Sequence, residues 1–340
     1  MPKNNSLFVI SLDFELYWGL RDVWPLTHYQ NVFAGERGQI PQVLKLFECN
    51  GIHATWATVG MLFARNRDHL EGHLPREQPQ YQEEALSPYP HLADGQVGWD
   101  EKSDPNHYAL GLIRQIQGTA GQRIASHTFS HYYCQEAGQQ SEDFLADMQA
   151  AVKIAEEEGV SLDTMVFPRN QVRSDYLPLL GQVGIRAYRG NPKHALYRAG
   201  YSRHDSWFKR AFRLLDAYLN LTGYHTYSEE EIDSKYPMNL PASHFLRSYS
   251  HNVRLLEPLR LRRILKGMTQ AAERGEAYHL WCHPYNLVDN QGRCYQVLVD
   301  IVEHYKKLRT TFGMESLNME ELCERVARKD RTQKLNAERV

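Results

Sequence analysis

Leu7-Phe-Val-Ile-Ser-Leu-Asp-Phe-Glu15 is the stretch of the chain that says most about the fold. Residues 7–12 are almost continuously apolar, which is typical of a strand buried on both faces of a parallel sheet. Asp13 and Glu15 follow, and in an extended chain they point to the same face. A carboxylate pair at the end of a buried strand is costly unless it is paired, hydrogen-bonded or bound to a metal. The stretch therefore predicts a polar site at a strand end, or a strand that ends early and leaves both acids in water.

Strand-like and helix-like stretches alternate along the rest of the chain, which indicates an α/β fold with a mostly parallel sheet. The expected strands are residues 7–12, 54–59, 122–126, 163–167, 184–188 and 277–282. The expected helices are residues 39–49, 107–117, 141–158, 174–182, 258–274, 295–309 and 319–328.

Pairs of histidines four residues apart occur three times, as His69/His73, His127/His131 and His279/His283. Sixteen histidines in 340 residues would give about 0.75 such pairs by chance, so the spacing alone does not identify a metal site. The third pair lies on an expected strand, where four residues span about 13 Å, too far to share one ion. The first lies in a polar stretch that reads as a solvated helix end. The second follows the expected strand 122–126, where α/β enzymes keep their sites, and is either a metal site or two polar loop residues.

Two further strand ends carry polar side chains. His283 ends the apolar stretch 280–283 before Pro284, and Arg169 follows the apolar run 165–167. A lone His in such a place is more often a satisfied core or loop residue, and an Arg there can simply pair with a surface acid. An acid pair, a His pair, an Arg and a His at four strand ends are together much harder to explain by chance than any one alone.

These motifs resemble those of the polysaccharide deacetylase superfamily, the NodB-homology or carbohydrate esterase 4 group, and they occur in the family's order. The matching stretches are Ser11-Leu-Asp-Phe-Glu15, Ala54-Thr-Trp-Ala-Thr-Val-Gly60, Ser126-His-Thr-Phe-Ser-His131, Phe167-Pro-Arg-Asn-Gln171 and Leu280-Trp-Cys-His-Pro284. Two departures stand out. Phe14 takes the place of a second aspartate, so that the next carboxylate is Glu15, and Arg169 follows a proline where the family usually has the arginine first.

The resemblance implies an irregular (β/α) barrel of about seven strands. It implies one catalytic domain over residues 1–327, with inserted segments at about 66–106 and 190–250, followed by a charged, frayed tail at 328–340. The first insertion reads as a long loop or a lid on the active face. The second contains aromatic residues and an amphipathic stretch, Phe208–Leu221, and these aromatics would either stack on sugar rings or pack the insertion against the barrel.

The resemblance also implies roles for individual residues. Glu15, His127 and His131 would bind one divalent metal ion, with zinc expected and cobalt or manganese as alternatives. Asp13 would act as the general base, although the Asp-x-Glu spacing leaves open which of the two carboxylates is the ligand. The other expected site residues are His283 as general acid, Arg169 as the group that keeps Asp13 ionised, and Asn170, Tyr132 and Trp18 as substrate contacts.

The expected reaction is the metal-dependent hydrolysis of an N-acyl group, expected to be acetyl, on an amino sugar. The substrate would be a small molecule or an oligosaccharide, for example a nucleotide- or lipid-linked precursor in surface-polysaccharide assembly. Two alternatives stay open. One is a related C–N hydrolase that acts on a cyclic amide or on a formylated sugar. The other is an inactive barrel that binds carbohydrate without turning it over.

Composition excludes several other classes of protein. A net charge of −2 gives no electrostatic footprint for nucleic acid, and no run approaches 18 apolar residues, so no membrane insertion is expected. The sequence contains no P-loop and no Gly-x-Gly-x-x-Gly motif. The first residues do not read as a signal peptide, and five cysteines at unrelated spacings fit reduced thiols, so we expect a cytoplasmic protein.

Overall fold

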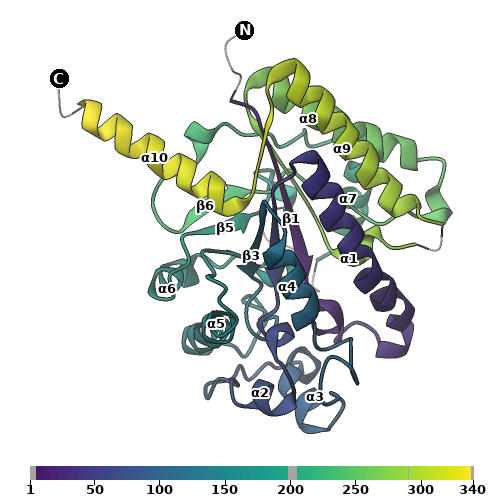
Figure 1. Cartoon of the computed structure of the whole chain (residues 1–340), viewed down its shortest axis with the longest axis vertical. Coiled ribbons are helices and arrows are strands. Elements are labelled where there is room, and N and C mark those ends of the chain that lie inside the picture. Colours follow the sequence, from purple (N-terminus) through teal and green to yellow (C-terminus); the bar gives the residue numbers. More distant parts are fainter. Residues whose placement is uncertain (1–4, 198–204, 290, 338–340) are drawn as a thin grey trace.

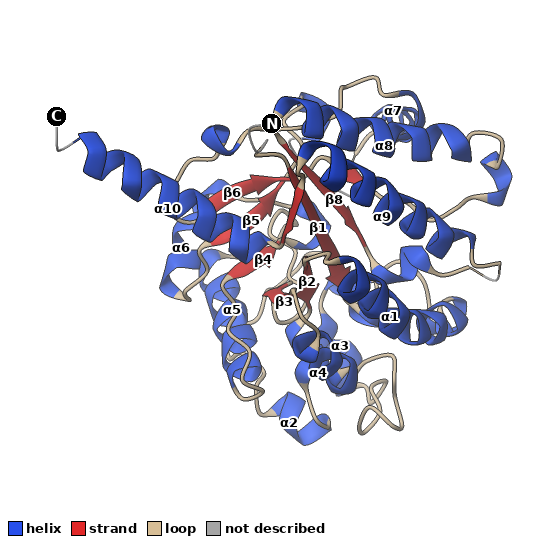
Figure 2. Cartoon of the chain, turned by 45° about the horizontal axis from the view of Figure 1, so that its top comes forward, coloured by secondary structure: helices blue, strands red, loops and turns tan. Residues whose placement is uncertain are grey.

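The computed structural model describes residues 5–197, 205–289 and 291–337, with side chains as far as residue 335. In this part of the chain nine strands form one sheet, and every strand pairs in parallel with its neighbours. Helices surround the sheet (Figures 1 and 2). The strands are β1 (Leu7–Phe14), β2 (Ala54–Thr58), β3 (Gln122–Ser126), β4 (Thr164–Val166), β5 (Ala187–Gly190), β6 (Met238–Pro241), β7 (His244–Phe245), β8 (Ala277–Cys282) and β9 (Glu315–Leu317).

The strand order is β6-β5-β4-β3-β2-β1-β8-β7, with β9 beside the start of β1. The two residues between β6 and β7 connect the ends of this sheet. The Ala242 N–H donates to the Gly190 carbonyl of β5 (2.9 Å), and the Ser243 N–H donates to the His279 carbonyl of β8 (2.8 Å). The sheet therefore curls into the expected irregular (β/α) barrel, and the predicted fold class is confirmed.

The helices bury apolar stripes against this barrel. In the first long helix, Phe33, Ile40, Val43 and Phe47 recur at helical spacing and are buried, and Gly51 ends the helix with a left-handed φ of 63°. The helices are α1 (Gln30–Asn50), α2 (Arg67–Glu71), α3 (Pro88–Ala93), α4 (Leu110–Gly118), α5 (Ser141–Glu156), α6 (Leu177–Gln182), α7 (Trp207–Leu219), α8 (Glu257–Arg274), α9 (Arg293–Phe312) and α10 (Met319–Ala337).

Each of the six expected strands and seven expected helices is present, with shifted ends. The sequence analysis missed β6, β7 and β9, because each has only two to four residues, includes a polar residue, and so shows no apolar run. In addition, β6 ends in Pro241, and a proline usually argues against a strand. Since β6 and β7 close the barrel, the segment 190–250 contains part of the barrel itself, and is not only an insertion.

Most of the segment that was expected to be a charged, frayed tail is helical. Residues 328–337 continue α10, which extends away from the barrel (Figure 1). Its middle part is held by Arg325, which pairs with Glu229 (2.9 Å) and Glu315 (2.7 Å), and by Lys329, which also pairs with Glu229. Among the helices of the described segments, none has both the length and the apolar composition needed to cross a membrane.

Candidate active site

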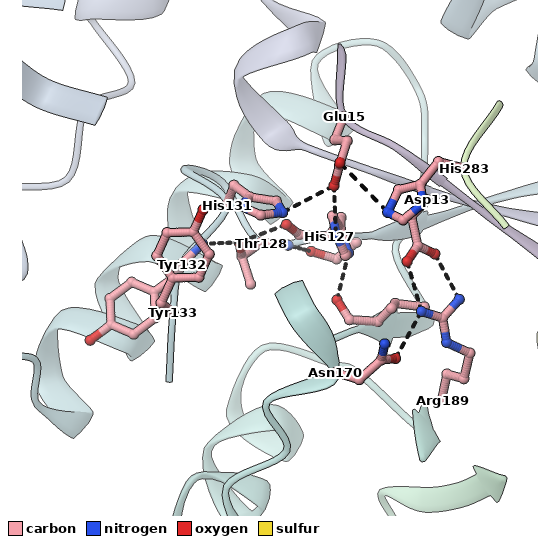
Figure 3. A network of polar contacts seen from close by, with 12 residues as sticks. Asp13, Glu15, His127, Thr128, His131, Tyr132, Tyr133, Asn170, Arg189 and His283 are labelled. Atoms are coloured by element: carbon pink, nitrogen blue, oxygen red, sulfur yellow. Dashed lines mark hydrogen bonds and ion pairs between the residues drawn. The ribbon is translucent and has the colours of Figure 1, made fainter. Parts of the chain in front are cut away.

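Polar side chains from distant parts of the chain meet where the parallel strands end, the edge at which open and closed α/β sheets bind ligands. Figure 3 shows them converging on Glu15 and Asp13. Their positions are Asp13 on β1, Glu15 directly after β1, His127 and His131 after β3, Arg189 on β5 and His283 after β8.

Glu15, His127 and His131 form a buried cluster that could hold one metal ion. The Glu15 Oε2 lies 3.0 Å from the Nε2 of His131 and 3.4 Å from the Nε2 of His127. The His127 Nδ1 lies 2.9 Å from the Val166 carbonyl, a contact that orients the ring so that Nε2 is the nitrogen turned toward the carboxylate. A carboxylate and two imidazoles are a common ligand set for catalytic zinc, so these residues fit the expected metal.

The loop that carries both histidines, residues 126–133, has an unusual backbone. Thr128 and His131 have φ angles of 61° and 58°, a region that non-glycine residues seldom occupy. Asp147 of α5 stabilises the loop, because its carboxylate accepts the N–H of Phe129 (2.7 Å) and both the N–H and the hydroxyl of Ser130. The structure thus holds the two imidazoles in place through a buried acid on a neighbouring helix.

The carboxylate of Glu15 fits closely into its surroundings. A Cβ atom on Gly19 would lie only 2.1 Å from the Glu15 Cδ, so the short helix after β1 approaches this closely because position 19 is glycine. Burial alone would raise the pKa of Glu15, but the nearby charges of His283 and His131 and hydrogen bonds from His127 and His131 lower it well below the usual value.

Asp13 lies in a different environment and pairs with an arginine. Its two carboxylate oxygens accept bonds from both terminal nitrogens of Arg189, each at 2.7 Å. Burial raises the pKa of Asp13, yet the charge and hydrogen bonds of Arg189, together with the charges of His127 and His283, lower the pKa overall. Arg189 also donates to Ser11 Oγ (3.0 Å) and to Asn170 Oδ1 (2.9 Å).

The expected contact between Arg169 and Asp13 is wrong. Arg169 instead donates to Asp22, and its guanidinium lies over the Tyr133 ring, 4.4 Å from the centroid. Arg169 has a φ of 52°, which turns it away from the direction that a regular strand end would take. The sequence did contain a signal for Arg189, since a charged residue at the end of the expected strand 184–188 is the same kind of pattern that drew attention to Arg169.

His283 faces Glu15 from the opposite side of the site. Its Nε2 lies 3.6 Å from the Glu15 Oε1, and its Nδ1 contacts the Asn286 Oδ1 at 3.1 Å, so that the amide oxygen orients the ring. The imidazole also stacks on Tyr285, with centroids 4.6 Å apart and planes inclined by 16°. In this arrangement Nε2 is the nitrogen turned toward Glu15 and the cavity beside it.

A cavity of about 270 Å³ opens beside these groups. Asn170 lines it, as expected for a substrate contact, whereas Trp18 and Tyr132 do not. Trp18 is buried and donates from its indole N–H to the His107 carbonyl (2.9 Å), and the Tyr132 hydroxyl donates to the Gln140 carbonyl (3.0 Å). The sequence analysis missed the apolar and aromatic part of the lining, which consists of Leu20, Val23, Phe245, Trp281 and Tyr285.

The other two histidine pairs lie elsewhere. The Nε2 of His279 contacts the Ser11 hydroxyl (2.9 Å) within the sheet. His69 and His73 were expected at a solvated helix end. Instead, each Nε2 lies 2.9 Å from one oxygen of Glu157. These atoms could also reach one ion, but contacts of this length to separate carboxylate oxygens are those of hydrogen bonds.

Comparisons with known proteins agree with this architecture. No protein-family model and no curated protein matches the chain. Among solved structures, the "putative polysaccharide deacetylase" from Mycobacterium smegmatis is 14% identical and superposes with a TM-score of 0.59, covering 98% of this chain and 93% of that one. The probable polysaccharide deacetylase from Pseudomonas aeruginosa PAO1 is 11% identical, with a TM-score of 0.56 and coverage of 95% and 91%.

A third similar structure is that of PuuE allantoinase, at 12% identity and a TM-score of 0.54, with coverage of 95% of this chain and 90% of that one. At identities this low, the superpositions establish the fold alone, and the activity has to be argued from the site residues. The barrel, its strand order and these superpositions agree with the motifs in the sequence, and the chain therefore has the fold of the polysaccharide deacetylases.

Proposed function

We propose that the protein is a metal-dependent hydrolase that removes an N-acyl group from an amino sugar, with acetyl as the first expectation for this group. The observation that carries this proposal is the convergence of a metal-capable triad, an Arg-paired carboxylate and an imidazole around one cavity. Amide hydrolysis needs a nucleophilic water, a base to deprotonate it and an acid to protonate the leaving amine. The site offers a residue for each of these tasks.

Glu15, His127 and His131 would hold the divalent ion, with zinc as the first expectation and cobalt or manganese as alternatives. Such an ion polarises a carbonyl and lowers the pKa of water. Asp13 would accept the proton of the attacking water, and Arg189 keeps this carboxylate ionised and oriented. His283 would donate a proton from Nε2 to the leaving nitrogen, while Asn286 fixes its ring.

The lining of the cavity favours a sugar as substrate. Tyr285 and Trp281 offer aromatic faces and edges to the C–H groups of a pyranose, and Asn170 and Arg169 offer polar groups to its hydroxyls. A nucleotide- or lipid-linked precursor of a surface polysaccharide would place this amino sugar within the cell. All five cysteines lie among the described residues and are free thiols, which is compatible with the cytoplasmic location that we propose.

Two other functions remain as alternatives. The likeness to PuuE allantoinase makes hydrolysis of a cyclic amide the second candidate, and a formylated sugar would use the same groups. A carbohydrate-binding barrel without turnover is the third.

Amine release from a panel of substrates tests the proposal. Protein loaded with zinc, cobalt or manganese is incubated with N-acetylated and N-formylated amino sugars, their nucleotide- and lipid-linked forms, and cyclic ureides. We expect release from an N-acylated amino sugar, and release about 10²–10⁴-fold slower from Asp13→Asn, a variant that keeps the size of the side chain. Ring opening of a cyclic ureide alone, followed through the new carboxylate because the freed nitrogen stays in a urea group, would support the second candidate. Carbohydrate binding without hydrolysis would support the third.

A further inference from the structure

Helix α7 exposes its apolar side. Its apolar residues recur at spacings of one, three and four, and so form one face of a helix, as in a core helix, yet this face points to solvent. The exposed fractions are 67% for Trp207, 66% for Phe208, 51% for Leu215 and 53% for Leu219. Trp207 and Phe208 therefore do not pack this segment against the barrel, whereas Tyr218 and Tyr227 are buried and Tyr227 packs in one core cluster with Leu7 and Val9 of β1, so the expected packing holds for part of the aromatics.

The polar side of α7 explains this orientation. Asp216 is buried and accepts bonds from Arg263 of α8 (3.0 Å), from the Thr222 hydroxyl (2.8 Å) and from the Leu221 N–H (2.7 Å). Arg213 is also buried and pairs with Asp205. Breaking these buried ion pairs to turn the helix over would leave uncompensated charges, which is strongly unfavourable. The apolar side of α7 is thus held outward by the structure.

The start of α8 extends this apolar area. Leu255 is 86% exposed, and Leu256 and Leu259 are exposed beside it. Helices α7 and α8 pack against each other at the edge of the molecule (Figure 2). We call the exposed apolar residues of these two segments the α7–α8 face; they are Trp207, Phe208, Phe212, Leu214, Leu215, Leu219, Leu255, Leu256 and Leu259.

A groove of about 750 Å³ runs from the α7–α8 face toward the candidate active site. Leu215 and Leu256 line one part of the groove and Phe245 lines another. Phe245 also lines the catalytic cavity, and Asn286, which orients His283, lines the groove as well. An apolar chain that lies in this groove would reach the edge of the cavity.

The charges around the α7–α8 face are mostly positive. Residues 205–219 and 245–263 contain eight Lys or Arg and three Asp or Glu, although the whole chain has a net charge of −2. All three acids are paired: Asp205 with Lys209 and Arg213, Asp216 with Arg263, and Glu257 with Arg260. Arg247, Arg254 and Arg262 are exposed at the margins of the face. A basic rim around an amphipathic helix that bears Trp, Phe and Leu is the pattern of a protein surface that lies in the headgroup region of an anionic membrane.

A second copy of the chain is a poorer partner for the same face. In a two-fold symmetric dimer the same patch meets itself, so the basic rims of the two copies would oppose each other. Like charges across an interface are repulsive.

We propose that the α7–α8 face docks the protein on the surface of an anionic lipid bilayer, with the apolar side chains among the headgroups and the arginines on lipid phosphates. Docking in this way requires no membrane-spanning segment. The groove then connects the bilayer surface with the catalytic cavity. This connection favours a lipid-linked amino sugar over a nucleotide-linked one as the substrate. The inference about the substrate, unlike the docking itself, rests on the proposed function.

Vesicle co-sedimentation tests the docking. The full chain is mixed with vesicles of phosphatidylcholine alone, or of phosphatidylcholine and phosphatidylglycerol in roughly a 2:1 ratio. We expect binding to the anionic vesicles that weakens with added salt, and little binding to the neutral ones. The triple variant Trp207→Ser/Phe208→Ser/Leu215→Ser should lower the partition coefficient about tenfold or more, because each substitution removes apolar area. The matched control Trp99→Ser/Leu335→Ser removes exposed apolar residues elsewhere and should bind like the unmodified chain.

The proposal is wrong if the unmodified chain does not bind anionic vesicles, or if the triple variant binds them equally well. It is also wrong if the unmodified chain sediments as a dimer and the triple variant as a monomer, because a second copy would then cover the face. The triple variant should keep its metal content and its hydrolysis of a water-soluble N-acetyl sugar. Vesicle binding without hydrolysis of any substrate would contradict the proposed function and leave the docking intact. Hydrolysis without vesicle binding would contradict the docking and leave the proposed function intact.

Discussion

Asp13 and Glu15 are only two residues apart, yet they lie in different electrostatic surroundings. Asp13 faces the guanidinium of Arg189, and Glu15 faces three imidazoles. An Arg-paired carboxylate remains ionised and cannot leave its partner easily, whereas a carboxylate among imidazoles is a good metal ligand. Residue-scale geometry therefore favours a division of roles between base and ligand.

Substitution of each acid by its amide tests this division. Asp13→Asn should keep a stoichiometric metal ion and lower turnover by about 10²–10⁴-fold, the usual effect of losing a general base. Glu15→Gln should lower metal affinity, because a neutral amide is a weaker ligand than a carboxylate. Metal content and kcat are measured on both variants. If Asp13→Asn loses the metal while Glu15→Gln retains it, the roles are exchanged.

Arg189 and Arg169 can be distinguished in the same way. Arg189→Gln removes the bidentate partner of Asp13 and should reduce kcat by at least about tenfold with the metal retained, and Arg189→Lys should restore part of this loss. Arg169→Gln leaves the Asp13 pair untouched and should affect KM more than kcat. Equal losses of kcat in the two glutamine variants would contradict the positioning role of Arg189.

His283 is expected to protonate the leaving group. An amine must be protonated to leave, whereas a phenolate leaves unaided, so His283→Ala should harm amide hydrolysis much more than hydrolysis of a phenyl ester. The variant should retain its metal, because three other residues provide the ligands. Kinetics on both substrates are compared with metal content. The same fractional loss on ester and amide, or loss of the metal, would remove the general-acid role.

At the scale of elements, the helices act as supports for the strand ends. Helix α5 provides Asp147 for the loop 126–133, and α10 packs on the opposite end of the barrel through a contact between His53, just before β2, and Glu321. Both oxygens of Glu321 lie 2.8 Å from the His53 Nδ1, and this hydrogen bond raises the pKa of His53 despite partial burial.

This contact should make the docking of α10 depend on pH. A His whose pKa is raised in the folded state stabilises the fold fully below its unfolded pKa of about 6.5, and this stabilisation is lost as the pH rises through the raised value. Glu321→Gln should therefore melt at a lower temperature than the unmodified chain near pH 6 and at nearly the same temperature near pH 9. Glu324→Gln, an exposed acid on the same helix, is the control and should show little pH-dependent difference. A difference of equal size at both pH values would exclude the His53 contact as its cause.

At the scale of the whole molecule, the barrel brings together residues that are up to 270 positions apart, as His283 and Asp13 are. Only one of the three histidine pairs is placed with Glu15 by this closure, although all three have the same spacing. The position of the candidate metal site is thus a property of the closed barrel more than of the spacing.

Metal analysis of two double variants tests that position. His127→Ala/His131→Ala should lose the bound zinc, cobalt or manganese, because two of three ligands are removed. His69→Ala/His73→Ala should keep it, since this pair hydrogen-bonds Glu157. Loss of one ion from each variant, starting from two in the unmodified chain, would show a second site on α2. If the unmodified chain binds one ion and both variants lose it to the same extent, the assignment of the metal to His127 and His131 is wrong.

The sequence by itself determined the fold class and most of the candidate site. The long buried strands β1 and β8 and the loop Ser126–His131 carry strong local patterns, so their periodicity and motifs identified the barrel and the acids and histidines at its strand ends. The tertiary structure decided the rest. The partner of Asp13 is Arg189, and the sequence could not show this, because the distance between two side chains on β1 and β5 depends on how far the sheet curls.

The three-dimensional arrangement also decided what is buried. Trp18 and Tyr132 resemble substrate contacts in the sequence but lie in the core, and the apolar stripe of α7 resembles a core face but points outward. A pattern of residue types specifies which side chains share a face. Which face is covered depends on neighbours that are distant in sequence, here the ion pair between Asp216 and Arg263, and only the folded chain brings those neighbours together.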